Sequence, residues 1–206
     1  WWGHSSFFIE HEGVKIITDP YDDSLPYQII TDKADYVTVS HGHFDHSATD
    51  SLPGNFEVIN SRDGLENSEI NIEAIKSYHD SHQGEDRGDN LIYLITIGDK
   101  KICHLGDLGH LLDDKIIDKL QNIDLLLIPV GGNYTIDAEK AFKIAKKIDP
   151  KTIIPMHFQT DILDFPIQGV NEFTDEFDQD KVEFTGVSEI NISDVKDKKV
   201  IVLDYV

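Results

Sequence analysis

Four residues whose side chains bind metals stand within six positions of the chain, directly after a short apolar run. The run is Tyr36 to Val39, and the four residues are His41, His43, Asp45 and His46. A buried strand that ends in a loop fixes the first side chains of the loop while leaving them accessible. In an extended segment His41 and His43 project to one side and can share a metal, whereas Asp45 and His46, past the turn, can bind a second. The segment predicts a site for two cations; a histidine-rich surface loop or a lone structural metal is the simpler alternative.

One loop cannot enclose two cations, so further ligands must come from elsewhere in the chain. Histidine or aspartate at the end of a predicted strand is the expected kind, and His79, Asp107 and His157 stand out. His82 competes with His79, which we expect to be the ligand. Taken alone, each histidine is as well explained by a surface hydrogen bond, and Asp107 by a role in a turn.

The pattern of apolar residues predicts a layered α/β fold. Alternating or continuous apolar runs indicate strands, and apolar residues at helical spacing indicate three helices. Asp137 is a suitable N-cap for the second of these helices. No linker or repeat interrupts the order, so we expect residues 1–206 to form one domain. The expected strands cover 7–9, 14–18, 36–39, 56–59, 70–78, 91–97, 101–105, 123–130, 152–154, 182–184, 190–192 and 200–203, and the expected helices cover 111–120, 138–148 and 170–177.

The charge balance argues against a nucleic-acid or membrane partner. The net charge is −21, from 39 acidic and 18 basic residues. Such a field repels phosphate backbones and anionic lipid surfaces, although the acidity is equally well explained as a means of keeping the protein in solution. No long apolar run or basic leader is visible, and the single cysteine, Cys103, excludes an internal disulfide. We expect a cytoplasmic protein in which Cys103 belongs to the core.

The order His-x-His-x-Asp-His, then histidine, then aspartate after a glycine, then histidine, resembles the metallo-β-lactamase superfamily. The segments Trp2 to Phe7, Asp19-Pro20, His104 to His110, Pro129 to Gly132 and Ile154 to His157 resemble its branch of bacterial and archaeal metal-dependent hydrolases related to ascorbate-phosphate lactonases. The likeness runs from the start of the chain to about Phe158. It implies a four-layer αββα sandwich made of two pseudo-repeats.

The resemblance also implies a division of the ligands between two metals. His41, His43 and His79 would bind one metal, Asp45, His46 and His157 the other, and Asp107 would bridge them. Imidazole and carboxylate ligands suit two Zn²⁺ ions per chain, with Mn²⁺ or Fe as alternatives. A hydroxide bridging the metals would attack a carbonyl or phosphoryl centre, so Asp45, which would also orient that nucleophile, and Asp107 are the expected catalytic residues. No Gly-x-Ser-x-Gly segment offers a serine nucleophile.

Candidate substrate contacts are scattered along the chain, and each has an ordinary structural alternative. Arg87 and Asn90 lie in a polar stretch after His79, which could equally be a solvated loop. Tyr134 follows two glycines and, with Thr135, could line the rim or cap a helix. The other candidates, which could instead be core or surface histidines, are His4, His104 and His110.

These observations predict a hydrolase for a small, anionic ester, lactone or phosphodiester. A nuclease of the same superfamily is the main alternative, against which the acidic charge argues. A flavin-linked di-iron oxygen reductase would carry a carboxylate where this chain has His43. A metal-stabilised binding module without catalysis is the alternative from another class. The sequence leaves the substrate, the native metal and the oligomeric state open.

Overall fold

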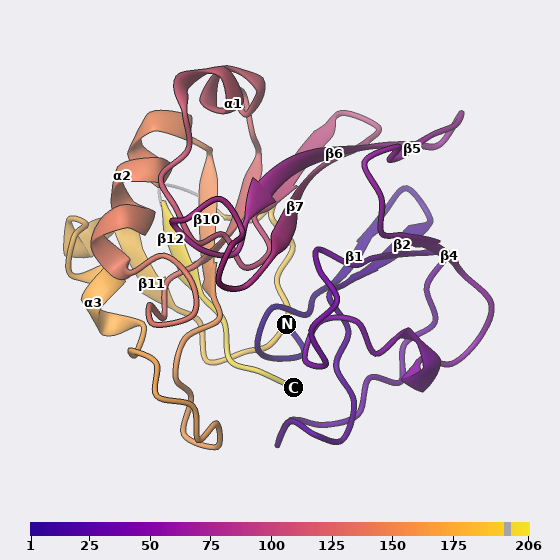
Figure 1. Ribbon diagram of the computed structural model, residues 1–206, viewed down its shortest axis with the longest axis horizontal. Helices are drawn as coiled ribbons and strands as arrows, with labels where there is room; N and C mark the ends of the chain where they lie inside the picture. Colours follow the sequence, from indigo (N-terminus) through magenta and orange to yellow (C-terminus); the bar gives the residue numbers. More distant parts are fainter. Residues whose placement is uncertain (196–198) are drawn as a thin grey trace.

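Two β-sheets lie face to face in the computed structural model, which describes residues 1–195 and 199–206 (Figure 1). The smaller sheet has the strand order β1-β2-β3-β4, with the first pair antiparallel and the others parallel. Its first two strands form a hairpin through Glu12 and Gly13, which both have positive φ as a tight turn requires. The strands are β1 (Phe8–His11), β2 (Val14–Thr18), β3 (Tyr36–Thr38) and β4 (Glu57–Ile59).

The larger sheet has eight strands in the order β11-β12-β10-β9-β8-β7-β6-β5. Strands β5 to β8 form an antiparallel meander, and β8 to β12 pair in parallel. Strands β9 and β10 are buried along their whole length, as expected of parallel strands covered on both faces. The strands are β5 (Leu65–Glu66), β6 (Ile70–Tyr78), β7 (Asp89–Ile97), β8 (Lys100–His104), β9 (Leu125–Pro129), β10 (Thr152–Met156), β11 (Val182–Phe184) and β12 (Val200–Val202).

The α-helices cover the outer face of the larger sheet, on the left in Figure 1. Helix α2 (Ala138–Ile148) begins where predicted, because the Asp137 side chain accepts a hydrogen bond from the backbone N–H of Lys140. The other helices are short: α1 (Asp114–Lys119), α3 (Asn171–Thr174) and the 3₁₀ helices η1 (Thr49–Ser51) and η2 (Gln179–Lys181). No helix among the described residues has the length and apolar character needed to cross a bilayer.

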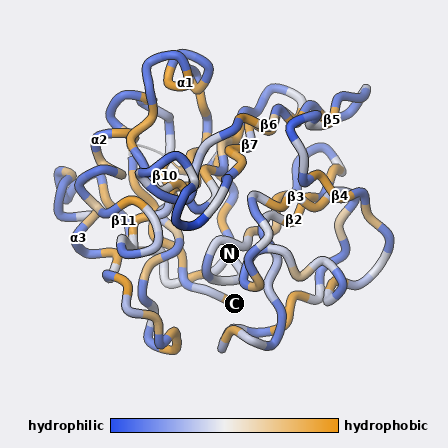
Figure 2. The backbone as a smooth tube through the Cα atoms, in the orientation of Figure 1, coloured by the Kyte–Doolittle hydropathy of each residue, from blue (hydrophilic) through white to orange (hydrophobic). Residues whose placement is uncertain are grey.

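Two apolar clusters hold these layers together. The main cluster fills the space between the sheets and under the helices, and it includes Cys103 as predicted. The second lies on the other side of the smaller sheet, where Tyr21, Ile30 and Leu163 from loops pack against Ile17 and Val37. Figure 2 shows the resulting pattern, with hydrophobic residues along the strands and hydrophilic residues along the outer loops.

The structure departs from the predicted elements in several places. Residues 190–192 form no strand, because Asn191 organises a turn in which its side chain and carbonyl accept the N–H groups of Ser193 and Asp194. The first predicted helix begins only at Asp114, since Asp113 caps it, and the third shortens to a single turn. Over the outer side of the smaller sheet, the described residues form loops and η1 in place of an α-helix.

Candidate metal centre

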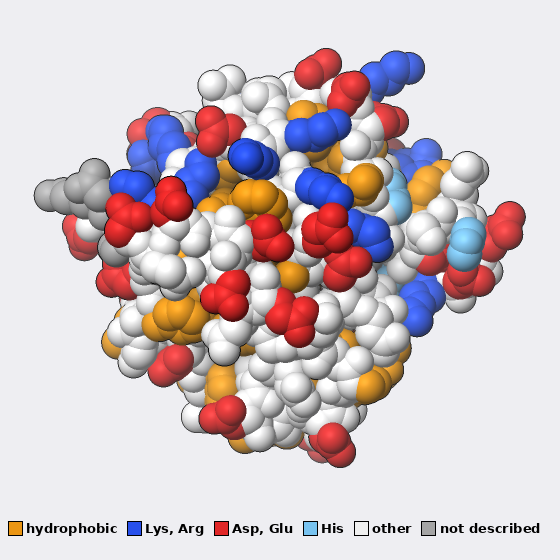
Figure 3. All heavy atoms as spheres, turned by 90° about the vertical axis from the view of Figure 1, so that its left-hand side faces the viewer, with side chains coloured by type: hydrophobic (Ala, Val, Ile, Leu, Met, Phe, Trp, Pro, Cys, Tyr) orange, Lys and Arg blue, Asp and Glu red, His pale blue; other side chains and the backbone are white. Residues whose placement is uncertain are grey.

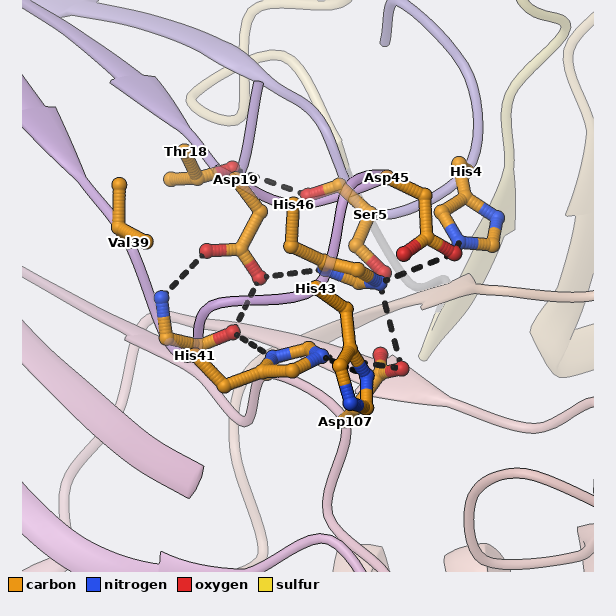
Figure 4. A network of polar contacts seen from close by, with 12 residues as sticks. His4, Ser5, Thr18, Asp19, Val39, His41, His43, Asp45, His46 and Asp107 are labelled. Carbon is orange, nitrogen blue, oxygen red and sulfur yellow. Dashed lines mark hydrogen bonds and ion pairs between the residues drawn. The ribbon is translucent and has the colours of Figure 1, made fainter. Parts of the chain in front are cut away.

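The carboxyl ends of five strands meet at one edge of the two sheets. The residues that follow these strands include all seven predicted ligands. The loop after β3 supplies four ligands, and β6, β8 and β10 are followed by His79, Asp107 and His157. Strand β2 ends at Thr18, and the next residue, Asp19, lies beside this loop (Figure 4). Tyr93 from β7 ties the sheets together here, because its hydroxyl lies 2.7 Å from the carbonyl oxygens of both Val39 and Ile59.

Asp107 lies at the centre of the cluster. Its Oδ2 is 3.2 Å from Nε2 of each of His46, His79 and His157, and 3.9 Å from Nε2 of His41. Its Oδ1 is buried and has no hydrogen-bond partner among the described residues. A buried carboxylate encircled by imidazole nitrogens, with one oxygen unpaired, is the arrangement that a bound cation would satisfy.

Asp19 fixes the orientation of two of these histidines, a role that sequence analysis missed. Its Oδ2 accepts hydrogen bonds from the Ser40 hydroxyl at 2.6 Å and from His46 Nδ1 at 2.9 Å, and its Oδ1 accepts the Ser40 N–H at 2.8 Å. Since the Ser40 proton goes to Asp19, Ser40 Oγ accepts from His41 Nδ1, 2.9 Å away. Both imidazoles therefore carry a proton on Nδ1 and turn Nε2 toward Asp107, so that Nε2 is the nitrogen each offers to a metal. The signal was available, because Asp19 also follows a predicted strand.

The charges of the cluster call for a positive ion. Burial lowers the pKa of His41 to about 3, so this ring is neutral. Burial alone would lower the pKa of His46 too, but the field of Asp107 and the hydrogen bonds to Asp107 and Asp19 raise it well above its ordinary value. Burial would raise the pKa of Asp107, yet the surrounding His157 and His46 hold it well below the usual range. In the absence of a metal, a proton on His46 balances these carboxylates.

The ligand atoms fall into groups of the size that one cation needs. His41, His43 and His79 have ligand atoms within 4.8 Å of one another, which is the set expected for the first metal. His46 and His157 form a second group with His4. Of the two competing histidines, His79 lies buried in the cluster, whereas His82 is exposed and pairs with Asp86 at 2.5 Å. The residues present therefore fit two metals, with His79 and not His82 placed to ligate.

Two of the six predicted substrate contacts face the metal cluster. A cleft of about 480 Å³ has Arg87 and Tyr134 in its wall, beside five of the predicted ligands and the aromatic rings of Phe44 and Phe165. The Arg87 guanidinium lies 4.8 Å from the centre of the Tyr134 ring, and no residue that the structure describes hydrogen-bonds its Nη1. The backbone of this loop is folded by Asp80, whose carboxylate accepts N–H groups from four residues, including Arg87.

The other four predicted contacts are corrected by the structure. His4, Asn90 and His104 have no exposed surface and therefore cannot touch a substrate. Asn90 supports the site from behind, because its Oδ1 accepts the Asp107 N–H at 2.9 Å, and His104 hydrogen-bonds the backbone of Ser5 and Gly106. His110 lies outside the cleft and accepts the N–H of Tyr78. Single-sequence reasoning could not separate these buried polar residues from exposed ones.

Comparison with known proteins assigns the family. A model of the β-lactamase superfamily domain matches residues 1–157, the span that holds every predicted ligand. A crystal structure from Thermotoga maritima, described as a candidate Zn-dependent hydrolase of the metallo-β-lactamase superfamily, matches with a TM-score of 0.79 and 36% identity, covering 98% of this chain and 96% of that one. The chain belongs to the metallo-β-lactamase superfamily. The predicted fold, the α/β sandwich of the metallo-β-lactamase superfamily, is thereby confirmed, with loops and η1 in place of the expected α-helix layer outside the smaller sheet.

Curated relatives place the chain among the metal-dependent hydrolases of the superfamily. The UPF0173 metal-dependent hydrolase of Carboxydothermus hydrogenoformans is 32% identical over 187 residues, which cover 77% of this chain and 83% of the relative. Its counterpart in Thermoplasma acidophilum is also 32% identical over 187 residues, with 78% and 82% covered. This member of the metallo-β-lactamase superfamily is a metal-dependent hydrolase.

Proposed function

We propose that this hydrolase binds two divalent cations, with Zn²⁺ as the native metal, and cleaves a small anionic ester, lactone or phosphodiester. The observation that carries the proposal is the position of Asp107, whose Oδ2 lies 3.2 Å from three imidazole nitrogens contributed by both groups of ligands. A carboxylate shared between two groups of ligands suits a bridge between two cations. Mn²⁺ and Fe accept the same nitrogen and oxygen ligands and are the alternatives to zinc.

The ligands would be divided as the superfamily resemblance implies. His41, His43 and His79 would hold one cation, Asp45, His46 and His157 the other, and Asp107 both. Such cations lower the pKa of a water molecule and polarise the oxygen of a carbonyl or phosphoryl group. The remaining tasks, which are to orient the attacking water, to bind the substrate and to exclude the wrong substrates, fall to side chains of this chain.

Asp45 is the side chain placed to orient the attacking water. Burial would raise the pKa of Asp45, but the hydrogen bond from His4 and the field of His46 hold it well below its ordinary range, so the group is ionised. Its Oδ2 is engaged by His4 at 3.2 Å, and no described residue hydrogen-bonds its Oδ1. Oδ1 can therefore accept a proton of the water and direct its lone pair toward the substrate.

Arg87 is the side chain placed to bind the anionic part of the substrate. Among the described residues it is the one lysine or arginine in the cleft wall, and its Nη1, beside the stacked Tyr134 ring, has no partner among them that would compete with a carboxylate or phosphate. Phe44 and Phe165 offer apolar surface on the same cleft. A compact anion with an apolar portion fits this lining.

The surface charge favours a small molecule over a nucleic acid. On the helical face, lysines are interspersed with acidic side chains (Figure 3), and those of α2 pair with them, as in Lys143–Glu139, Lys147–Asp114 and Lys140–Asp137. A polymer would have to cross a surface of net charge −21 to reach the cleft. We place this hydrolase in the cytoplasm, where a single buried thiol needs no disulfide partner.

A panel of esters, lactones and phosphodiesters, assayed with and without added Zn²⁺, tests the proposal. We expect metal-dependent hydrolysis of a small anionic member, with a rise in KM of about tenfold or more on Arg87→Gln and a smaller rise on Arg87→Lys. Tyr134→Phe keeps the stacking ring and is the matched control. Robust cleavage of RNA at low salt, abolished by His41→Ala, would replace this function with that of a nuclease.

A further inference from the structure

His4 is held in an unusual backbone conformation beneath the metal cluster. Its φ is +50°, and the preceding Gly3 has φ +113° with its Cα so close to the Tyr27 ring that a Cβ would lie 2.5 Å from it. The His4 carbonyl accepts hydrogen bonds from the indole of Trp1 and from the N–H of His157, both at 3.1 Å. The turn is thus fixed on both sides, and the His4 side chain is fully buried.

The imidazole of His4 lies behind the three proposed ligands of the second metal. Its Nε2 is 3.2 Å from Oδ2 of Asp45, a residue 41 positions away in the chain. Its ring centre is 4.1 Å from that of His157 and 5.0 Å from that of His46. Its Nδ1 is buried and finds no hydrogen-bond partner in residues 1–195 or 199–206. The contact of His4 with Asp45 is visible at the right of Figure 4.

The chemistry of the pair fixes the direction of the hydrogen bond. An ionised carboxylate only accepts, so His4 must carry its proton on Nε2 and donate it to Asp45. A carboxylate without such a partner can rotate about its last bond and exchange its two oxygens. We propose that His4 is a positioning residue that locks Asp45, occupying Oδ2 so that Oδ1 is left for the second metal and for the attacking water.

This inference rests on the proposed two-metal site and assigns one contact within it. The competing interpretation is direct ligation, since His4, His46 and His157 have ligand atoms within 4.8 Å of one another. Direct ligation through Nε2 would require this nitrogen to lose its proton and its bond to Asp45. A substituted side chain that can donate a hydrogen bond to Asp45 but has no imidazole ring therefore distinguishes the positioning role from direct ligation.

Two substitutions at His4 separate hydrogen bonding from backbone strain. In His4→Gln the side-chain amide N–H₂ reaches the position that Nε2 occupies in His4, so it can donate a hydrogen bond to Asp45. In His4→Asn the shorter side chain places its amide N–H₂ only where Nδ1 lies in His4. Asparagine tolerates positive φ better than glutamine does, so the strain runs in the opposite order. Ser6→Ala is the matched control in the same turn, because the buried Ser6 hydroxyl has no hydrogen-bond partner in the part of the chain that the structure describes.

The measurement is the affinity for each Zn²⁺ equivalent, titrated into metal-free protein against a chelating dye, with the melting temperature of the metal-free variants alongside. We expect His4→Asn to weaken the second equivalent about 10–100-fold and to leave the first unchanged, the size usual for the loss of a partner behind a ligand. His4→Gln should restore the second affinity to near that of the unaltered protein, although it melts lower without metal than His4→Asn. Ser6→Ala should change neither.

Three results would overturn the inference. If Gln weakens the second metal as much as Asn, the imidazole itself is required and His4 ligates directly. If the loss of affinity for the second Zn²⁺ follows the fall in melting temperature, so that His4→Gln is worse than His4→Asn, His4 only stabilises the backbone turn. If the unaltered protein binds a second Zn²⁺ and neither variant changes the affinity for it, His4 has no part in the site. If the unaltered protein binds no second Zn²⁺, the proposed two-metal function is refuted as well.

Discussion

Replacing Asp19 by asparagine should weaken the support of the metal ligands, because an amide cannot accept all the hydrogen bonds that this carboxylate accepts. Asp19 accepts three hydrogen bonds through its two oxygens and is fully buried, so water cannot replace a lost partner. The amide has one oxygen. It can face either the Ser40 N–H or the pair formed by the Ser40 hydroxyl and His46 Nδ1, and its N–H₂ then meets a donor on the other side.

The number of hydrogen bonds lost sets the expected loss of stability. At least one buried N–H loses its acceptor, which costs about 1–3 kcal/mol, and the bonds that remain lose the charge of the acceptor. We expect a loss of about 2 kcal/mol in the free energy of unfolding of metal-free protein. For a chain of this length that is a fall of about 4–8 °C in melting temperature. Since His46 and His41 are less firmly oriented, metal affinity should fall about tenfold or more.

Thermal unfolding of the metal-free protein and a Zn²⁺ competition titration measure the two effects. Asp32→Asn is the control, because Asp32 accepts one bond, from the Trp2 indole at 3.1 Å, and an amide oxygen can accept it equally well. If Asp19→Asn matched this control in both measurements, Asp19 would not orient the ligands, and the proposed support of His41 and His46 would be refuted.

Three further predictions follow from the same geometry. Burial raises the pKa of Cys103 and leaves it no exposed surface, so the thiol should react with a disulfide reagent only after unfolding; rapid reaction of native protein would contradict this. His79→Ala should lose one metal equivalent and nearly all activity, whereas His82→Ala should retain both, and elemental analysis showing the reverse would transfer the role to His82. Because the pKa of His46 in the metal-free protein lies above its ordinary 6.5, the stability gained from its proton is present below about pH 6.5 and lost as pH rises through the raised value. Metal-free protein should therefore melt lower at alkaline pH while Zn²⁺-loaded protein does not, and parallel curves for the two forms would count against a cation in place of this proton.

The local features of this fold were predictable from sequence, because each depends on neighbouring residues. The hairpin through Glu12 and Gly13 follows from turn chemistry, and helix α2 follows from its cap at Asp137 and its apolar spacing. The cluster of ligands was predictable too, since strand ends carry the motif residues. Residues 190–192 show the limit, because their alternation fits a strand but their turn is made by side-chain bonds that periodicity does not register.

The roles of the supporting residues could not be predicted, because each acts through contacts between distant parts of the chain, and a place at a strand end, as Asp19 has, does not show which side chains it meets. Asp19 meets Ser40 and His46 across 21 and 27 positions, and His4 meets Asp45 across 41. His4 looked like a possible substrate contact until the structure showed it without exposed surface. Residue type and spacing indicate which groups can bind a metal, but only packing decides which of them face the cleft.

The metal content of the purified protein tests the central claim most directly. After dialysis against metal-free buffer and reloading with Zn²⁺, elemental analysis should give two equivalents per chain for the unaltered protein. It should give one or none for Asp107→Ala, since Asp107 Oδ2 contacts histidines of both groups. One equivalent in the unaltered protein, unchanged in Asp107→Ala, would contradict the bridging role and with it the two-metal centre.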